Sequence, residues 1–322
     1  MSTRLFKILI LLFIISFQVN AEIKDTIVVA RDGTGKYRNV QEAIENIRAY
    51  MDYTILVYVK NGTYKEKVVV PAWIKNVVIE GEDINNTIIT YDDHANIDKM
   101  GTFRTHTLKI EGDNVTLRNI TIENNAPQMG QAVALHTGGD KLKFIRCRFL
   151  GNQDTVFTGG ERTRLYFQDC YIEGTTDFIF GAATVLFENC IIHSKRNSYI
   201  TAASTVKEVE YGYVFKNCKL TAAEDVTKVY LGRPWRPYGA TLFMECELGS
   251  HILPAGWHNW NNPENEKTAR YAEYKNTGAG ANVTDRVKWS KQLTKKEADK
   301  VTVENIYKSV RIDNWDPKAD MF

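Results

Sequence analysis

The sequence predicts an all-β protein, a right-handed parallel β-helix in which short strands stack turn upon turn. The first observation is a repeat. Six segments follow, with few departures, the pattern apolar-x-apolar-x-Asn/Asp-Cys-x-apolar: residues 115–122, 142–149, 165–172, 185–192, 213–220 and 241–248. Successive copies begin 27, 23, 20, 28 and 28 residues apart, and self-similarity at such periods is typical of a solenoid.

The second observation concerns the cysteines. All five of them occupy the same position of the repeat, whose first copy has Ile120 there instead: Cys147, Cys170, Cys190, Cys218 and Cys246. The third is the alternation of apolar residues, which favours strands over helices because the runs are too short for helical repeats. Stacked strands lie about 4.8 Å apart, so the cysteines are expected to form one interior column.

The segments outside these six repeats are expected to begin, cap and flank the coil. Residues 26–30, 55–59, 66–70 and 77–80 are predicted to form its first strands. Residues 39–50 have apolar side chains on one face and Asn39 as an N-cap, which predicts a helix covering the open end. Aromatic and glycine-rich residues 254–260 and 271–289 are expected to be long loops. Thr294 and Glu297 have capping-box spacing, which predicts a C-terminal helix over 294–308.

The N-terminus resembles a secretory signal. Arg4 and Lys7 precede an apolar run over 8–17 and then a small residue, Ala21. This pattern predicts a signal peptide at 1–21 and export to the periplasm or the medium. The alternative is a membrane anchor, for which the run is short. Residues 22–322 are expected to form one β-helix domain, monomeric and not bound to a membrane.

Composition excludes some functions. The chain has 322 residues, of which 41 are Lys or Arg and 39 are Asp or Glu. Without Arg4 and Lys7 the balance is 39 to 39, which argues against a nucleic-acid binder driven by bulk charge. There is no C-x-x-C and no H-E-x-x-H, so no metal or other cofactor is expected.

An odd number of cysteines leaves at least one unpaired. Neighbouring turns bring Cα atoms within disulfide range, and the loop between Cys170 and Cys190 is the shortest. Those two are the best candidates for a disulfide. The alternative is that all five are buried thiols.

Two near-copies of one unit carry the candidate chemistry, CRFLGNQD at 147–154 and CYIEGTTD at 170–177. Asp154 and Asp177 therefore occupy equivalent places on adjacent turns. Two carboxylates held close together cannot both ionise freely, so one is expected to be an acid and the other a nucleophile or base. The alternative is that each aspartate only caps a corner. Arg233 beside Trp235 offers a cationic partner for one of them.

The chain resembles the pectin methylesterase (pectinesterase) family in four motifs that occur in the family's order: QAVAL at 131–135, QDT at 153–155, DFIFG at 177–181 and LGRPW at 231–235. Further similarities are TF at 102–103, PAGW at 254–257 and EYKNTGAG at 273–280, so the resemblance covers about residues 25–289. One departure is Val156-Phe157, where the family often has Leu-Tyr; it bears on subsite preference rather than on the reaction. Because no long pro-region precedes the first strand, we expect a bacterial-type member.

The resemblance implies hydrolysis of the methyl esters of pectin, with methanol as a product. It implies Asp177 as the nucleophile and Asp154 as the general acid and base. The amides of Gln131 and Gln153 would hold the oxyanion, and Arg233 would keep Asp177 ionised. Four more residues are implied to contact the polysaccharide: Thr102, Phe157, Phe180 and Trp235.

Other classes of protein would need different sequence features. A Ser-His-Asp esterase would need a G-x-S-x-G elbow, which is missing. A β-helix polysaccharide lyase would need a calcium-binding carboxylate cluster, and only the aspartate pair is seen. A glycosidase acting on pectin also uses two carboxylates, so the pair alone does not exclude it. A non-catalytic sugar-binding solenoid is the last alternative.

Overall fold

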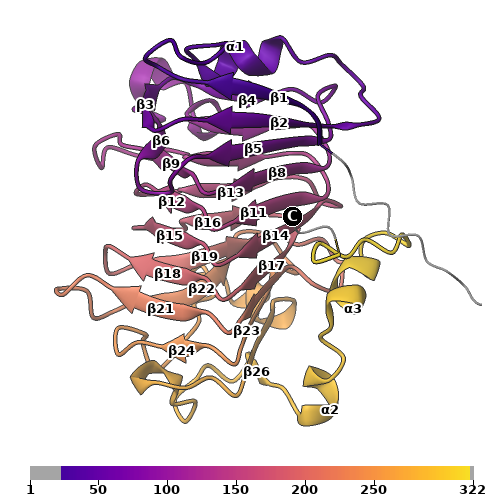
Figure 1. The fold of residues 1–322 in the computed structure, drawn as a ribbon. Helices are drawn as coiled ribbons and strands as arrows, with labels where there is room; N and C mark the ends of the chain where they lie inside the picture. Colours follow the sequence, from indigo (N-terminus) through magenta and orange to yellow (C-terminus); the bar gives the residue numbers. More distant parts are fainter. Residues whose placement is uncertain (1–22, 320–322) are drawn as a thin grey trace, which may run out of the picture.

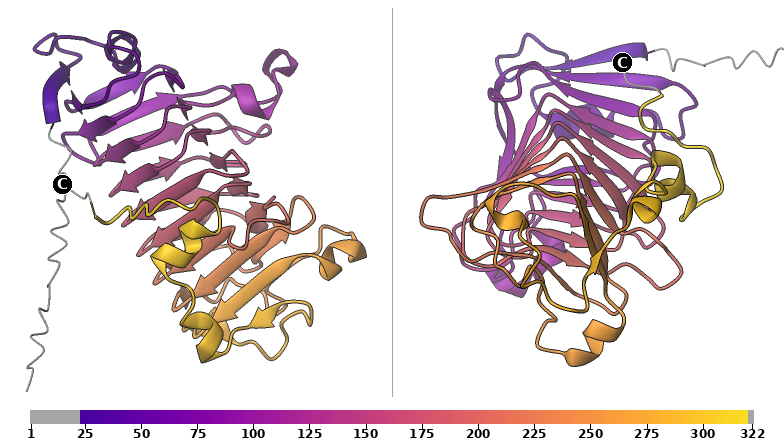
Figure 2. Two further views of the ribbon diagram at one scale, coloured as in Figure 1. Left: turned by 90° about the vertical axis from the view of Figure 1, so that its right-hand side faces the viewer. Right: turned by 90° about the horizontal axis from the view of Figure 1, so that it is seen from below.

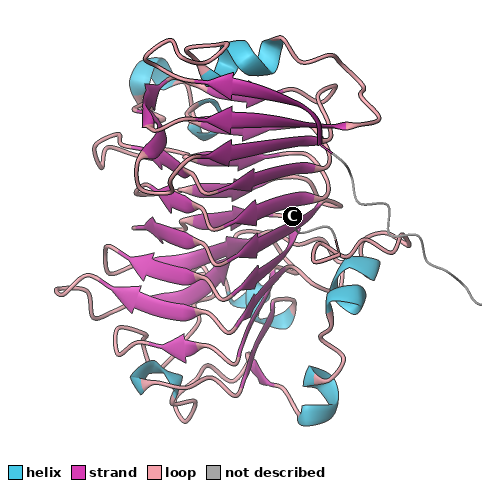
Figure 3. Cartoon of the chain, viewed as in Figure 1, coloured by secondary structure: helices cyan, strands magenta, loops and turns pink. Residues whose placement is uncertain are grey.

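The computed structural model describes residues 23–319, so the predicted signal peptide at 1–21 lies outside the described residues. The body of the molecule is a parallel β-helix, as predicted (Figure 1). The helices are short and lie at the ends of the coil and in loops on its sides (Figure 3). No helix within residues 23–319 has the length and apolarity needed to cross a bilayer.

The described strands form three parallel sheets, here called sheets A, B and C, and one turn of the coil gives one strand to each sheet. Sheet A contains, in spatial order, β1 (Ile23–Val29), β2 (Thr54–Val59), β5 (Val77–Gly81), β8 (Val115–Arg118), β11 (Leu142–Ile145), β14 (Arg164–Gln168), β17 (Thr184–Glu188), β20 (Tyr213–Lys216), β23 (Ala240–Met244), β25 (Arg270–Tyr274) and β26 (Lys291–Gln292). Sheet B contains β3 (Gly62–Lys65), β6 (Thr87–Tyr91), β9 (Thr121–Asn124), β12 (Arg148–Leu150), β15 (Tyr171–Gly174), β18 (Ile191–Ser194), β21 (Lys219–Ala222) and β24 (Glu247–Leu248). Sheet C contains β4 (Val68–Val70), β7 (Leu108–Ile110), β10 (Leu135–Thr137), β13 (Val156–Thr158), β16 (Ile179–Gly181), β19 (Tyr199–Ala203) and β22 (Tyr230–Pro234).

The repeat position before each cysteine makes the corner between sheets A and B. These residues all have φ between 49° and 57°, in the left-handed region: Arg146, Asp169, Asn189, Asn217 and Glu245. Asn119 has the same conformation before Ile120, with φ 54°. Asn and Asp tolerate this conformation better than most residues, which explains why they recur at this position.

The interior is built from columns of like residues. In sheet A the rings of Phe144, Phe167, Phe187, Phe215 and Phe243 stack in register with centroids 4.3 to 4.8 Å apart. The cysteines form the predicted column beside them. Offset stacking of buried rings adds to the free energy gained from area burial, so this column stabilises the coil along its length.

The predicted disulfide between Cys170 and Cys190 is wrong, because both are free thiols, as are the other three cysteines. Each sulfhydryl donates instead to a sheet A carbonyl of the preceding turn; Cys170 Sγ lies 3.3 Å from the Phe144 carbonyl and Cys190 Sγ lies 3.6 Å from that of Phe167. In-register parallel stacking points neighbouring Cβ atoms the same way at about the strand spacing, which is too far apart for the usual disulfide geometry.

The N-terminal end is covered by a helix, as predicted, but a short one. Helix α1 (Val40–Glu45) lies over the end of the coil and buries Val40, Ala43 and Ile44 (Figure 1). The predicted N-cap is wrong, since the Asn39 side chain makes no capping hydrogen bond. The Glu66 carboxylate does this instead, accepting from the backbone N–H groups of Val40 at 2.8 Å and Gln41 at 2.9 Å.

The C-terminal segment crosses the outer face of sheet A (Figure 2). The single helix predicted for 294–308 is two helices, α2 (Lys295–Ala298) and α3 (Val303–Lys308). The capping box at Thr294 is confirmed, but the Thr302 hydroxyl accepts from the backbone of Asn305 and starts a second helix. Four short 3₁₀ helices complete the described secondary structure: η1 (Ile97–Lys99), η2 (Thr102–Arg104), η3 (Pro263–Lys267) and η4 (Ala279–Ala281).

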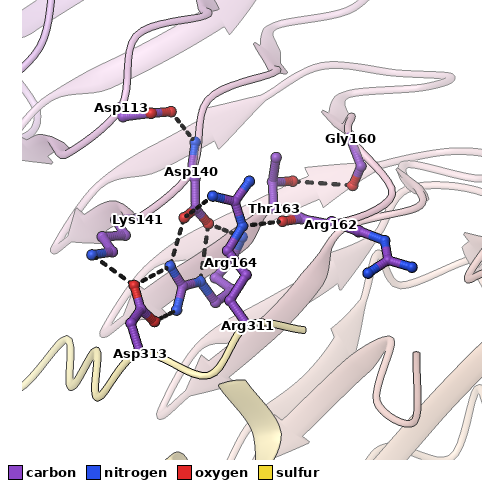
Figure 4. Close-up of polar contacts among 9 residues, drawn as sticks. All are labelled: Asp113, Asp140, Lys141, Gly160, Arg162, Thr163, Arg164, Arg311 and Asp313. Atoms are coloured by element: carbon purple, nitrogen blue, oxygen red, sulfur yellow. Dashed lines mark hydrogen bonds and ion pairs between the residues drawn. The ribbon is translucent and has the colours of Figure 1, made fainter. Parts of the chain in front are cut away.

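A buried arginine ties this segment to the coil (Figure 4). The Arg164 side chain on β14 is fully buried and pairs with Asp140 at 2.6 Å. It also pairs with Asp313 of the C-terminal segment, and Asp313 pairs with Lys141 at 2.9 Å. Because Arg164 on sheet A pairs with a carboxylate of the coil and with one of the C-terminal segment, its charge links that segment to sheet A.

Candidate active site

The site lies on the outer face of sheet C, where strands β10, β13, β16, β19 and β22 lie side by side (Figure 1). Register places one residue of each strand in an outward column, in the order His136, Phe157, Phe180, Ala202 and Arg233. The candidate residues lie in or beside this column.

Asp154 and Asp177 each stand two residues before a strand of this sheet, on adjacent turns as the repeat predicts. Both have left-handed backbones, with φ 66° and 49°, and both side chains are largely buried. The Asp177 N–H donates to the carbonyl of Tyr199 at 2.8 Å. Aspartate tolerates this conformation, and its recurrence at equivalent places gives the two side chains the same position on adjacent turns.

Arg233 binds Asp177 through two parallel hydrogen bonds. Its Nε lies 3.0 Å from Oδ1 and its Nη2 lies 2.6 Å from Oδ2. The two residues come from strands that are not neighbours, since β19 runs between β16 and β22. In the column Ala202 on β19 lies between Phe180 and Arg233, and its side chain is small.

The two carboxyl groups differ in their surroundings. Burial raises the pKa of Asp154 well above its usual value, and the neighbouring charge of Asp177 raises it further. Burial also raises the pKa of Asp177, but the hydrogen bonds and charge of Arg233 oppose that shift. The pKa of Asp154 is therefore raised further than that of Asp177, which favours Asp154 as the protonated member of the pair.

Gln131 and Gln153 lie on adjacent turns beside the aspartates. The backbone N–H of Ala132 donates to the Gln153 carbonyl at 3.0 Å, which fixes the two glutamines relative to each other. Both side chains are partly exposed, and neither side-chain amide forms a hydrogen bond to any residue in 23–319. Both amides are thus free to donate to a ligand.

An aromatic row flanks the carboxylates. Phe157 and Phe180 have ring centroids 4.9 Å apart, and Phe180 lies 5.8 Å from Trp235. Thr102 lies at the start of η2, where its carbonyl accepts from Thr105. Its neighbour Phe103 extends the row, with its ring 4.9 Å from that of Phe157.

Several residues of the site were missed from the sequence. Tyr199 and Trp260 lie against Arg233, and the only sequence signal was the aromatic richness of residues 254–260. His136 and His106 continue the aromatic row, with His136 edge-on to Phe157 at 4.7 Å. Burial and the charge of Lys109 lower the pKa of His136 to about 3, so it is a neutral ring.

No group of three or more His, Cys, Asp or Glu side chains within 23–319 is placed to hold a metal ion. The groups gathered at the described site are two carboxyl groups, a guanidinium and two side-chain amides.

Comparison with known proteins gives a consistent result. The Pectinesterase family model matches residues 26–309. "Pectinesterase 31" of Arabidopsis thaliana is 37% identical over 84% of this chain and 88% of its own length. Several other curated relatives are longer, and the chain spans about half their length.

Solved structures agree with the sequence matches. Pectin methylesterase from carrot is 35% identical, with a TM-score of 0.84, and the match covers 88% of this chain and 93% of that one. A pectin methylesterase variant crystallised with a hexasaccharide is 28% identical, with a TM-score of 0.78, covering 91% and 98% of the two chains. The chain therefore belongs to the pectinesterase family.

Proposed function

We propose that this protein hydrolyses the methyl esters of pectin with Asp177 as its nucleophile. The observation that carries the proposal is the asymmetry of the aspartate pair: Arg233 forms two hydrogen bonds to Asp177, whereas it acts on Asp154 through its charge alone. Family membership gives the reaction class, a carboxylic ester hydrolase of methyl-esterified homogalacturonan. The site supports the assignment of roles.

In the first half of the reaction an Asp177 carboxylate oxygen attacks the ester carbonyl carbon of a galacturonate unit. The tetrahedral oxyanion accepts hydrogen bonds from the side-chain amides of Gln131 and Gln153. The intermediate collapses and expels methoxide, which takes the proton of Asp154 and leaves as methanol. The product of this half is an acyl-enzyme, a mixed anhydride of Asp177 and the galacturonate.

In the second half Asp154, now a carboxylate, takes a proton from a water molecule. The resulting hydroxide attacks the acyl carbon, and collapse releases the free galacturonic acid group and the Asp177 carboxylate. Asp154 is protonated again, so the cycle closes with one water consumed and one methanol released. Arg233 keeps Asp177 ionised and oriented for the first attack, and binds its carboxylate again when the acyl-enzyme is hydrolysed.

The aromatic row supplies the contacts for the polysaccharide. Phe157, Phe180 and Trp235 present apolar faces on which sugar rings and methyl groups pack. That a family member was crystallised with a hexasaccharide supports an oligosaccharide-binding cleft in this fold. Thr102, one residue before Phe103, is proposed to contact the same chain. Export, by the pattern of residues 1–21, remains a prediction, as does the monomeric state.

Product analysis tests the reaction class. With highly methylated pectin, we expect methanol and titratable acid to appear in equal amounts and no new chain ends to form. New reducing ends without methanol would instead show a glycosidase, and new unsaturated ends would show a lyase. Binding without any product would show a non-catalytic sugar-binding protein.

A further inference from the structure

The guanidinium of Arg233 is covered on both faces by aromatic rings. Its central carbon lies 3.8 Å from the centroid of the Tyr199 ring and 3.7 Å from that of Trp260. We propose that Tyr199 and Trp260 are positioning residues that fix the plane of Arg233, and that this keeps Asp177 in its ionised form. The inference rests on the proposed function and adds two residues to it.

The hydrogen bonds to Asp177 explain why the plane has to be fixed. Two parallel bonds from Nε and Nη2 require the guanidinium and the carboxylate to lie nearly in one plane. The arginine side chain is long, and one ring would leave it free to tilt away on the other side. Rings at both faces remove that freedom and add cation–π attraction in a partly buried place.

Tyr199 is fixed to the nucleophile by its backbone as well. Its carbonyl accepts the N–H of Asp177 at 2.8 Å, while its ring packs on the arginine that binds the Asp177 side chain. Behind it, the Tyr230 ring stacks at 5.3 Å and nearly parallel, with an angle of 14°. Asp177, Arg233 and the Tyr199 ring are therefore held together as one unit.

Trp260 comes from a loop that is folded down onto β22. His258 donates its backbone N–H to the Gly232 carbonyl at 3.1 Å, and its Nδ1 accepts the N–H of Trp260 at 3.0 Å. Trp260 and Asn261 both have left-handed backbones, with φ 61° and 55°. A loop in such a conformation needs these anchors, and their effect is to hold the Trp260 ring against Arg233.

The consequence concerns the charge of Asp177. Burial alone raises its pKa, and the contact with Arg233 opposes that rise. If the guanidinium tilts, its hydrogen bonds to Asp177 weaken and lower the pKa of Asp177 less. Asp177 then takes up a proton at a higher pH. The titratable groups that face Asp177 and Arg233 come from several elements: Asp154 from the neighbouring turn, Tyr199 and Tyr230 from β19 and β22, His258 from the loop and Tyr271 from β25 in the interior.

The test compares kcat and KM across pH for matched variants. Tyr199→Leu and Trp260→Leu each remove one ring, and each is expected to lower kcat about fivefold to tenfold, the size of one cation–π contact. The acidic limb of the kcat/KM profile should move upward by roughly 0.5–1 pH unit. Tyr199→Phe and Trp260→Phe keep a ring and should restore both quantities to near wild type.

Tyr171→Leu is the control, because it removes a stacked ring of the same kind from sheet B, where Tyr171 packs on His193 with centroids 6.0 Å apart and does not touch the Arg233 guanidinium. Its profile should not move, with kcat within about twofold of wild type. An acidic limb that stays in place in Tyr199→Leu, or moves as far in Tyr171→Leu, would overturn the inference. If Trp260→Leu raises KM alone, Trp260 contacts substrate and does not position Arg233.

Failure of this inference is distinguishable from failure of the proposed function. If Asp177→Ala abolishes methanol release while the Leu variants behave as wild type, only the positioning role is lost. If Asp177→Ala keeps full activity, the proposed function itself falls. Thermal unfolding of each variant checks the fold, and Trp260→Leu, in a partly exposed loop, keeps the test open if Tyr199→Leu does not fold.

Discussion

Arg233 and Asp177 face each other across an intervening strand of sheet C and are joined by hydrogen bonds of 3.0 and 2.6 Å. In the proposed reaction this relationship decides which of the two neighbouring carboxyl groups is ionised. Within residues 23–319 no side chain forms a hydrogen bond or ion pair with the Asp154 carboxyl; the charge of Asp177 raises its pKa and the charge of Arg233 lowers it. The acid and the nucleophile of the proposed reaction therefore differ in their contact with Arg233, which forms hydrogen bonds to the nucleophile alone.

Replacement of Arg233 tests that difference. Lysine keeps the charge but lacks the planar fork, so Arg233→Lys should retain part of the activity. Arg233→Ala should lose more, and its acidic limb should move to higher pH because burial then raises the pKa of Asp177 unopposed. The measurement is the rate of methanol release as a function of pH.

A double mutant shows whether the two residues act together. Arg233→Ala combined with Asp177→Ala should cost little more than Asp177→Ala alone, because residues that act as a unit are not additive. A double loss equal to the product of the single losses would place Arg233 elsewhere, for example on a carboxylate of the substrate.

Asp154→Asn should separate activity from stability. The amide has the same shape but transfers no proton, so kcat should fall by about 10²–10⁴. The fold should gain stability at pH 7. In the native protein the pKa of Asp154 is raised, whereas in the unfolded chain it is about 3.8. Between these two pH values only the native carboxyl keeps its proton, so the free energy of unfolding of wild type falls as pH rises from about 3.8 toward the native pKa.

Thermal unfolding at two pH values checks the second part. The melting temperature of Asp154→Asn should exceed that of wild type at pH 7, and the difference should shrink below the ordinary pKa of 3.8, where both states are protonated. A variant with near-normal kcat would remove Asp154 from the mechanism, and one that melts lower at pH 7 would contradict its buried, protonated state.

The cysteine column should behave as five buried thiols. In the unfolded protein a thiol reagent should titrate five groups per chain, and in the native protein almost none. Burial raises the pKa of Cys170 and Cys190, so native thiolate is scarce as well as inaccessible. Reducing agent should leave the melting temperature unchanged; three titratable thiols in the unfolded chain would instead reveal a disulfide.

The ion pairs of Arg164 should contribute unequally to stability (Figure 4). Asp140→Asn leaves a fully buried guanidinium with only a half-exposed partner, and should cost about 3–5 kcal/mol of unfolding free energy. Asp313→Asn also removes one negative charge beside Arg164, but the Asp313 side chain is 44% exposed, so the loss of unfolding free energy should be about 1 kcal/mol or less. Denaturant unfolding measures both, and equal losses would contradict this ranking.

The sequence predicted the features that repeat locally. The coil follows from the cysteine column and the apolar alternation, because in-register stacking reproduces each turn above the last. The pairing of Asp154 with Asp177 follows from the same repeat, since equivalent positions on adjacent turns are neighbours in space. Arg233 could be assigned to Asp177 only through the resemblance, because the β22 turn lies two strands away.

The features missed depend on contacts between distant segments. The cap of α1 comes from Glu66, in the turn after β3, and outcompetes the local candidate Asn39. The ring pair around Arg233 joins a strand residue, Tyr199, to a loop residue, Trp260, and no spacing relates the two. The disulfide prediction failed because loop length says nothing about the direction of side chains in a parallel stack.

The central claim is that Asp177 is the nucleophile, and methanol release by Asp177→Ala and Asp177→Asn tests it most directly. Both variants should fold, since the coil does not depend on this carboxylate, and circular dichroism checks that. On highly methylated pectin neither should release methanol above the no-enzyme rate, while wild type at equal concentration does. Methanol release by either folded variant at a rate near wild type would contradict the account.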